Sequence, residues 1–415
     1  MSTTISRPAA PPVAALLASY AQDMRAELTR ITDFWLANTL DERRGGFIGQ
    51  MDSAGRLDAD ASKGSILNAR ILWTFSAAYR QTGQPAHLAA ATRAFDYLLA
   101  HFVDNEHGGI YWLVDADGQP LNTRKQIYAL AFAIYGLSEY YRATQNPLAL
   151  QASQALFEWI ETYSYDPAHG GYFEAFGRAG EPLADQRLSD KDRQAPKTMN
   201  THLHVLEAYA NLYHCWPDAR LAQRLRGLLD TFFTRILDAE TGHLRLFFAE
   251  DWMPVADLFS YGHDIEAAWL LREAAQVLGD ADLLTQVTAA TLRLAEATAA
   301  ALLPDGSLPH ELDRTTGHLD RHREWWVSAE AMVGFLDAYE LTGDAAYLHR
   351  SHQAWRFAQR HLLDHAHGEW RWGVHDDYRP MTEQDKVGFW KCPYHNARAC
   401  LEVLHRCRGL AHLPG

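Results

Sequence analysis

The chain has 415 residues, of which 47% are hydrophobic and 22% are charged, a balance that supplies ample material for a globular core. Its formal net charge of -14 argues against nucleic acid or an anionic membrane surface as a partner, because both attract cationic faces. No stretch reaches the roughly 18 consecutive apolar residues that a membrane-spanning helix needs.

The N-terminal segment, residues 1–13, is polar and proline-rich and predicts a disordered tail. The mildly apolar stretch 13–21 follows Arg7 and is compatible with a signal peptide. It continues, however, into Asp23 and Arg25 with apolar residues kept at helical spacing, which favours a first helix. Residues 14–415 are then expected to form a single domain.

A glycine-centred loop, flanked by aromatic or alternating apolar residues, recurs along the chain. The six copies are at Gly45, Gly108, Gly170, Gly242, Gly306 and Gly368, separated by 63, 62, 72, 64 and 62 residues. Such a regular period indicates a fold built from repeated units.

Each interval between these loops contains two segments with apolar residues at helical spacing. The pairs are 66–79 with 88–102, 127–141 with 148–163, 203–213 with 221–236, 265–274 with 283–302, and 329–339 with 347–363. The first member is the more apolar, which suits an inner helix, whereas the second carries a charged face, which suits an outer helix. The pattern predicts an all-α fold: an (α/α)6 barrel of six inner and six outer helices, with short β-hairpin loops at one rim. An open solenoid is the competing arrangement.

The first turns of all six inner helices carry large polar or aromatic side chains. These are Arg70, Tyr128, His204, His263 with Glu266, Trp326 with Glu330, and His395 with Arg398. If the barrel closes, these groups converge on one mouth, where a concave polar and aromatic site is expected.

The residue types at this mouth are those of sugar acid–base chemistry. Histidine titrates near neutrality and can both take and give a proton. Glu266 follows His263 by three residues, so it is expected to orient that imidazole and raise its pKa. Arg70 is suited to stabilising an enediolate oxyanion, and tryptophan faces stack on sugar rings. Of the neighbouring His202 and His204, we favour His204, because it shares a helical face with an asparagine, Asn200.

The other histidines and the cysteines have simpler interpretations. His310, His322 and His365 are expected to be solvated loop residues. The four cysteines, Cys215, Cys392, Cys400 and Cys407, form no C-x-x-C pair. They are interpreted as reduced, buried thiols of a cytoplasmic protein, in preference to disulfides or a zinc site.

Several segments at these positions resemble the cellobiose 2-epimerases of the N-acylglucosamine 2-epimerase superfamily. The most specific are SYGHDIEAAWLL at 260–271 and GFWKCPYHNARACLEVL at 388–404, and the matching blocks occur in order over nearly the whole chain after the tail. The resemblance implies an (α/α)6 barrel and conversion of a reducing-end glucose to mannose in a β-1,4-linked disaccharide such as cellobiose. It implies a proton transfer through an enediolate, with no metal and no cofactor.

The resemblance also implies roles for individual residues. His263 and His395 resemble the acid–base pair, and His204 and Arg70 resemble the groups that hold the O1 and O2 oxygens. Glu266 resembles the partner of His263. The expected sugar-binding positions are Tyr128, Asn200, Asp192, Trp326, Trp390 and Glu330. The partner is a small sugar, and a monomer or weak homodimer is expected.

Other hypotheses remain open from the sequence. An epimerase of free mannose and glucose, or a mannose-type aldose–ketose isomerase, would use the same motifs. A glycoside hydrolase would need Glu266 and Glu330 as opposed carboxylates, about 5–10 Å apart. A metal-dependent isomerase would use His204, His263 and His395 as ligands. A non-catalytic lectin would have no use for this set of groups.

Overall fold

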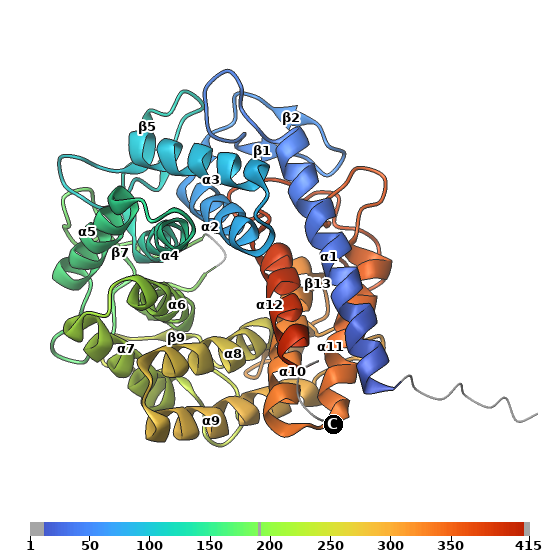
Figure 1. Ribbon diagram of the computed structural model, residues 1–415. Coiled ribbons are helices and arrows are strands. Elements are labelled where there is room, and N and C mark those ends of the chain that lie inside the picture. Colours follow the sequence, from blue (N-terminus) through green and yellow to red (C-terminus); the bar gives the residue numbers. More distant parts are fainter. Residues whose placement is uncertain (1–11, 190–191, 411–415) are drawn as a thin grey trace, which may run out of the picture.

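The computed structural model describes residues 12–189 and 192–410, and within them the chain forms two concentric rings of helices (Figure 1). The inner helices are α2 (Ser65–Thr82), α4 (Ile127–Thr144), α6 (Met199–Cys215), α8 (Tyr261–Leu278), α10 (Trp325–Thr342) and α12 (Tyr394–Leu410). The outer helices are α1 (Val13–Asn38), α3 (Pro85–Tyr97), α5 (Pro147–Tyr163), α7 (Ala219–Thr231), α9 (Ala281–Ala300) and α11 (Ala345–Phe357). Three outer helices end in a π-helical turn: η1 (Leu98–Phe102), η2 (Phe232–Ile236) and η3 (Ala358–Leu362).

The inner ring is closed. Each inner helix packs against the next, and α12 packs against α2, so the first and last inner helices are neighbours (Figure 1). The predicted (α/α)6 barrel is therefore confirmed, and the open solenoid is wrong. The N-terminal helix α1 packs against α12 and supplies its outer partner. No helix in the described ranges is long and apolar enough to span a bilayer.

The predicted tail differs from the structure at its last residue, because Val13 already begins α1. Residues 1–11 lie outside the described part of the chain. Leu16, Leu17 and Tyr20 of the same helix are buried in the core, which confirms the expected first helix.

Two glycines allow adjacent inner helices to approach closely. A Cβ at Gly136 of α4 would lie 2.6 Å from the Ala69 carbonyl oxygen of α2, and one at Gly334 of α10 would lie 2.5 Å from the Ile265 carbonyl oxygen of α8. A larger residue at either position would force the two backbones apart. The uniformly apolar sequences of these inner helices, which made their burial predictable, include glycine where the packing is tightest.

The rim that precedes the inner helices carries short antiparallel strands, as predicted for the hairpin loops. They are β1 (Gln50–Met51), β2 (Leu57–Asp58), β3 (Lys63–Gly64), β4 (Leu113–Val114), β5 (Pro120–Asn122), β6 (Lys125–Gln126), β7 (Ala175–Phe176), β8 (Lys197–Thr198), β9 (Phe247–Phe248), β10 (Leu258–Ser260), β11 (Glu311–Asp313), β12 (His318–Asp320), β13 (Arg323–Glu324) and β14 (Gly373–Val374). The sheets are β1-β2, β3-β4-β5, β6-β7, β8-β9, β10-β11-β12 and β13-β14. The strand entering an inner helix pairs with a strand of the following repeat in five of these six sheets, which ties neighbouring repeats together at this rim.

A buried ion pair connects the glycine loop to the start of the next inner helix. In the first repeat, the carboxylate of Asp41 accepts the Arg44 amide at 2.9 Å and the Lys63 ammonium at 2.7 Å, while its carbonyl accepts the Gly45 amide at 2.9 Å. The same pair recurs as Asp104–Lys125, Asp166–Lys197 and Asp364–Lys386, at 2.9, 2.7 and 2.5 Å. Each lysine is held with its charge compensated, and three of the four lie directly before an inner helix. The loops thereby fix where the inner helices begin.

Candidate active site

One position of the inner helices recurs around the barrel axis. The sixth residues of α2, α4, α6, α8 and α10 are Arg70, Phe132, His204, Glu266 and Glu330, and the fifth residue of α12 is Arg398. The Arg70 guanidinium lies 4.2 Å from the Phe132 ring, which lies 4.7 Å from the His204 ring. Across the axis, Arg398 donates to Glu266 at 2.6 Å and to Glu330 at 2.7 Å. The predicted convergence of the helix starts on one mouth is confirmed.

Each of the three predicted histidines has its Nδ1 atom engaged. The partner is Glu207 for His204, at 2.8 Å, and Glu330 for His395, at 2.7 Å. For both rings, the accepting carboxylate fixes the Nδ1–H tautomer and leaves the Nε2 lone pair available as a base. Burial lowers the pKa of His204, and burial together with two nearby arginines lowers that of His395. Both imidazoles are therefore neutral at physiological pH.

His263 is held differently from the prediction. Its Nδ1 lies 2.7 Å from the Ser260 hydroxyl, whereas the Glu266 carboxylate accepts from Arg398 at 2.6 Å. The expected partnership between Glu266 and His263 is thus wrong, although the two residues share a helix. The expected rise in pKa is also wrong: burial, assisted by nearby His204, lowers the pKa of His263 to about 3.

A tryptophan joins two of the histidines. The Trp326 ring lies 4.7 Å from the His263 ring and 5.9 Å from the His395 ring. Among the described ring contacts, it alone touches both. The indole therefore connects the two imidazoles at the mouth.

Arg70 and Tyr128 form another side of the mouth. The Arg70 guanidinium donates to the Tyr128 hydroxyl at 2.7 Å, and the Tyr128 ring meets the rings of His204 and Trp390 at 4.9 and 6.0 Å. The Arg70 Nε atom is buried and has no partner within the described chain. Because Arg70 is buried close to His204, its guanidinium places a positive charge next to that imidazole.

Asn200 and Asp192 lie at the edge of the mouth. Together with His263 and Glu311 they line a small cavity of about 60 Å³. The Asn200 side-chain oxygen is buried without a partner in the described residues. The Asp192 carboxylate accepts from the Ser189 amide at 2.8 Å and from the Ser189 hydroxyl at 2.9 Å.

Glu330 lies directly beneath His395. Its side chain is 1% exposed, and its two oxygens accept from His395, Arg398 and Trp269. The expected sugar contact of Glu330 stays a prediction, whereas its contact with the His395 imidazole is present in the structure. Glu330 therefore orients His395.

The chain is similar to known proteins over most of its length. The family model described as N-acylglucosamine 2-epimerase (GlcNAc 2-epimerase) matches residues 46–399. The chain belongs to this family. It is 49% identical to the cellobiose 2-epimerase of Bacteroides fragilis over 92% of this chain and 98% of that protein, and 40% identical to that of Ruminococcus albus over the same shares. The solved structure of the cellobiose 2-epimerase from Bacillus thermoamylovorans is 41% identical, covers 94% of this chain and 100% of that one, and superposes with a TM-score of 0.90.

The sequence pattern was not used to predict two residues, Glu207 and Ser260, that contact histidines of this N-acylglucosamine 2-epimerase family member. Glu207 follows His204 by three residues and Ser260 precedes His263 by three residues, so both lie one helical turn from the imidazole they hold. The prediction from three-residue spacing considered only Glu266 as a partner of His263.

The alternative chemistries fit this site poorly. Glu266 and Glu330 both accept from the same Arg398 nitrogen and are each 1% exposed, which does not place them on opposite sides of a glycosidic bond. The donor atoms of His204, His263 and His395 do not form a cluster within 4.8 Å among the described residues. The cluster of Glu266, Glu330 and His395 already holds the Arg398 cation.

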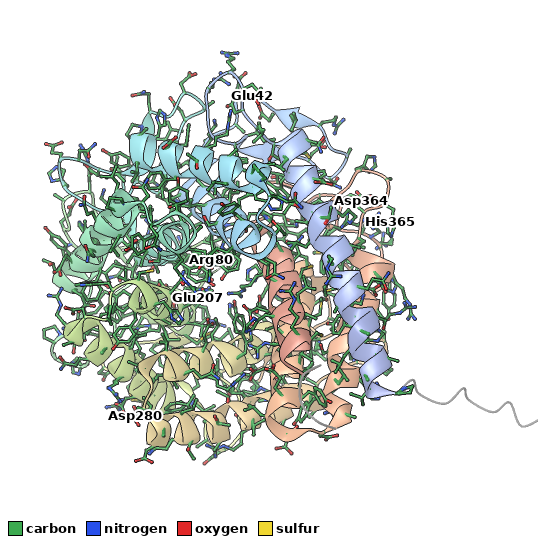
Figure 2. The ribbon with its side chains drawn as sticks, in the orientation of Figure 1. Glu42, Arg80, Glu207, Asp280, Asp364 and His365 are labelled. Atoms are coloured by element: carbon green, nitrogen blue, oxygen red, sulfur yellow. The ribbon has the colours of Figure 1, made fainter. Side chains whose placement is uncertain are left out.

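The interpretation of the remaining histidines is correct for one residue only. His365 is exposed on a peripheral loop (Figure 2). His310 and His322 are half-buried and stack at 4.2 Å, and His322 contacts Asp320 and Glu324. They are therefore structured parts of the mouth and not solvated loop residues. All four cysteines are free thiols, and three are buried.

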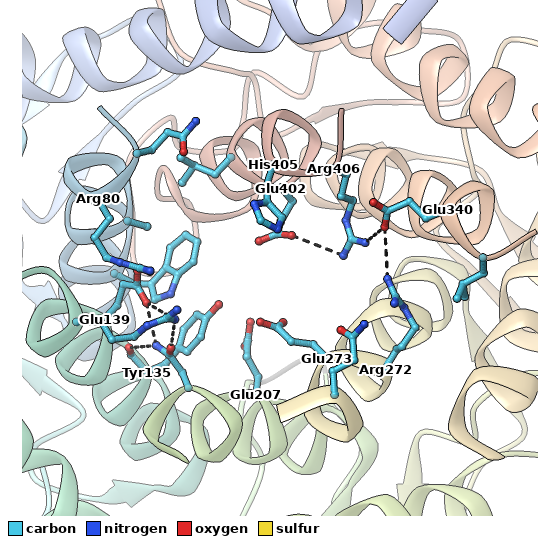
Figure 3. Close-up of a pocket in the computed structure, with 18 residues that line it drawn as sticks. Arg80, Tyr135, Glu139, Glu207, Arg272, Glu273, Glu340, Glu402, His405 and Arg406 are labelled. Carbon is cyan, nitrogen blue, oxygen red and sulfur yellow. Dashed lines mark hydrogen bonds and ion pairs between the residues drawn. The ribbon is translucent and has the colours of Figure 1, made fainter. Parts of the chain in front are cut away.

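The opposite end of the barrel holds a second cavity of about 570 Å³ (Figure 3). It is lined by the C-terminal halves of the inner helices, with arginine–glutamate pairs such as Arg80–Glu139 around its wall. Glu207 points into it from α6 (Figures 2 and 3). That carboxylate also accepts from His204 and Arg398, so it links the site at the mouth to the wall of this cavity.

Proposed function

We propose that the protein is a 2-epimerase that interconverts glucose and mannose at the reducing end of a β-1,4-linked disaccharide such as cellobiose. The high identity to cellobiose 2-epimerases over nearly their whole length supports this substrate class. The observation that carries the chemistry is the pair His263 and His395, two buried imidazoles whose rings both contact Trp326. An epimerisation needs a base on one face of the substrate carbon and an acid on the other.

The proton transfer proceeds on the open-chain aldehyde. One imidazole Nε2 removes the C2 proton, and the electrons of the broken C2–H bond form the C1–C2 double bond while the carbonyl electrons move to O1. The resulting enediolate is planar at C2. The other histidine takes up a proton from solvent before the step, so that the reacting pair consists of one neutral and one protonated imidazole, and it gives that proton to the opposite face of C2. The O1 carbonyl re-forms, glucose has become mannose, and the first histidine releases the proton it took to solvent.

The negative charge of the intermediate develops on O1 and O2. Arg70 supplies a permanent positive charge beside Tyr128, and His204 lies next to that pair. A buried, fixed guanidinium stabilises an oxyanion more strongly than water does, because no solvent has to reorganise when the charge forms. Arg70 and His204 are thus the groups that hold the enediolate oxygens.

The carboxylates below the mouth set the histidine tautomers. Glu207 and Glu330 accept the Nδ1 protons of His204 and His395, and Arg398 lies between them as a counter-charge. With one arginine compensating several carboxylates, these groups can remain buried. We further propose a cytoplasmic location, which the four free thiols support.

The decisive experiment is proton NMR in D2O. The purified, EDTA-treated protein is incubated with cellobiose and, separately, with mannose. Conversion of cellobiose to its mannose-ended epimer with deuterium at C2 is the expected result. Conversion of mannose alone identifies a monosaccharide epimerase, a ketose product identifies an isomerase, and absence of exchange with either sugar refutes the proton-transfer mechanism.

Variants assign the mechanism to the two histidines. His263→Ala and His395→Ala are each expected to lose at least about 10²-fold in kcat, the scale of general acid–base contributions. His365→Ala, a change at an exposed histidine away from the mouth, is the matched control and is expected to keep full activity. Full activity in either catalytic variant would contradict the two-base mechanism.

A further inference from the structure

Glu324 stands at the start of inner helix α10 without capping it. It occupies the N-cap position, but its side chain accepts no hydrogen bond from a backbone amide of the first turn of the helix. Its carboxylate instead accepts from two indoles: Oε2 from Trp326 Nε1 at 2.6 Å and Oε1 from Trp372 Nε1 at 3.0 Å. The Glu324 side chain therefore holds two tryptophan indoles and does not cap the first turn of α10.

The Trp326 indole is fixed from two directions. On one edge it donates to Glu324 at a short, charge-assisted distance. On the other it lies against α8 at Gly262, where a Cβ would be 2.5 Å from the indole. The same indole meets His263 at 4.7 Å and His395 at 5.9 Å. Its orientation therefore defines the surface between the two histidines.

His322 keeps the Glu324 carboxylate ionised. Its imidazole bridges Asp320 at 2.6 Å and Glu324 at 3.2 Å. Burial opposes the charge, but the two carboxylates raise the pKa of His322 overall. The pKa of Glu324 falls to about 2 against the effect of burial, through His322, the nearby His310 and the Trp372 contact. The acceptor that both indoles need is present throughout the physiological range.

We propose that Glu324 is a positioning residue of the epimerase: its carboxylate locks the Trp326 indole as the platform that holds the sugar ring between His263 and His395. The inference rests on the proposed function for its catalytic consequence. Proton transfer requires reacting atoms about 3–3.5 Å apart, and a misplacement of about 1 Å costs on the order of 10²-fold in rate. A platform free to rotate would shift the sugar relative to both imidazoles at once.

Glu324→Gln tests the lock because an amide cannot replace the carboxylate. Its one oxygen can accept from Trp326 or from Trp372, and its NH2 group then faces the N–H of the other indole. We expect kcat on cellobiose to fall about 10- to 100-fold, with a smaller change in KM. Glu161→Gln is the matched control, because Glu161 is a buried carboxylate that also accepts from two aromatic side chains, Tyr172 and Tyr209, but on outer helix α5; its kcat is expected to stay within about twofold.

A double-mutant cycle separates positioning from general damage. If Glu324 acts through Trp326, then Glu324→Gln adds little to the loss already caused by Trp326→Phe, because the indole N–H it holds is gone. Additive losses in the double variant, or full activity of Glu324→Gln, would overturn the proposal.

A spectroscopic readout is independent of activity. In the 1H–15N spectrum of the indole groups, the signals missing from Trp326→Phe and Trp372→Phe identify the two tryptophans. We expect the Trp326 signal to lie downfield in the wild type and to move upfield in Glu324→Gln. An unchanged Trp326 signal refutes the lock. If the signal moves while the wild type converts no sugar, the lock stands and the proposed function fails.

Discussion

Replacing Glu330 by Gln removes one negative charge from beneath His395 and leaves the shape almost unchanged. The Glu330 Oε1 atom accepts from His395 at 2.7 Å and from Arg398 at 2.7 Å, and Oε2 accepts from Trp269 at 3.1 Å. We expect the amide oxygen of the variant to take the place of Oε1, where it accepts from both His395 and Arg398. In this orientation the amide NH2 group faces only one donor, the Trp269 indole N–H. The Nδ1–H tautomer of His395 is therefore preserved.

The expected loss comes from the charge alone. A hydrogen bond to an ionised group contributes about 1.5–3 kcal/mol and a neutral one about 0.5–1.5, so the difference is about 1–2 kcal/mol. This stabilisation is strongest when His395 carries the extra proton, so it appears in kcat as a loss of about 5- to 30-fold. Burial and the nearby Glu330 charge raise the pKa of Glu266, so removing that charge also relieves a repulsion and limits the cost in stability.

The assay is the initial rate of cellobiose epimerisation together with deuterium incorporation at C2. Glu161→Gln is a suitable control, because Glu161 is also a buried carboxylate, accepting from Tyr172 at 2.8 Å and Tyr209 at 2.9 Å, but on outer helix α5. The control is expected to lose stability without losing kcat. An unchanged kcat in Glu330→Gln would show that His395 does not carry the proton in the rate-limiting step.

Three further outcomes are expected. Activity survives exhaustive EDTA treatment, because the Arg398 cation already neutralises the carboxylates below the mouth; loss that added Mn²⁺ or Zn²⁺ reverses would contradict this. Lowering the pH from 7 to 5 reduces the free energy of unfolding by up to about 2 kcal/mol through His263. The reason is that its folded pKa of about 3 lies below the unfolded value of about 6.5, so the unfolded state takes up the proton first. In urea titrations, the free energy of unfolding of His263→Asn should fall correspondingly less over the same pH range. Lys197→Met strands the buried Asp166 carboxylate and lowers the free energy of unfolding by about 3–5 kcal/mol, which adding Asp166→Asn should partly restore.

The barrel was predictable because its signals are periodic. Glycine loops every 62–72 residues and paired helical segments specify alternating inner and outer helices. A second periodic signal went unused: an aspartate precedes the glycine by four residues at Asp41, Asp104, Asp166, Asp238 and Asp364. Its role became clear only with the lysines in space, because Lys63 and Lys386 each lie 22 residues further along the chain than their partners.

The site was predictable as a set of residues but not as a network. Helix position brings His204, His263 and His395 to one mouth, and this follows from the repeat. Which carboxylate meets which cation does not, because Glu266 and Arg398 are 132 residues apart and come together across the axis. The three-residue spacing within α8 predicts Glu266 as the partner of His263, yet His263 contacts Ser260, the last residue of the preceding strand β10. Local spacing cannot rank such partners against those supplied by other helices.

The Glu207 carboxylate contacts both the site at the mouth and the cavity at the other end of the barrel. Glu207 faces His204 on one side and the far cavity on the other, where Glu273 and Glu402 lie near it (Figure 3). Burial, together with repulsion from Glu402 and Glu207, raises the pKa of Glu273 to about 7. A substitution at Glu273 or Glu402 would therefore change the electrostatic potential at Glu207, and through it at His204, without altering a residue at the mouth.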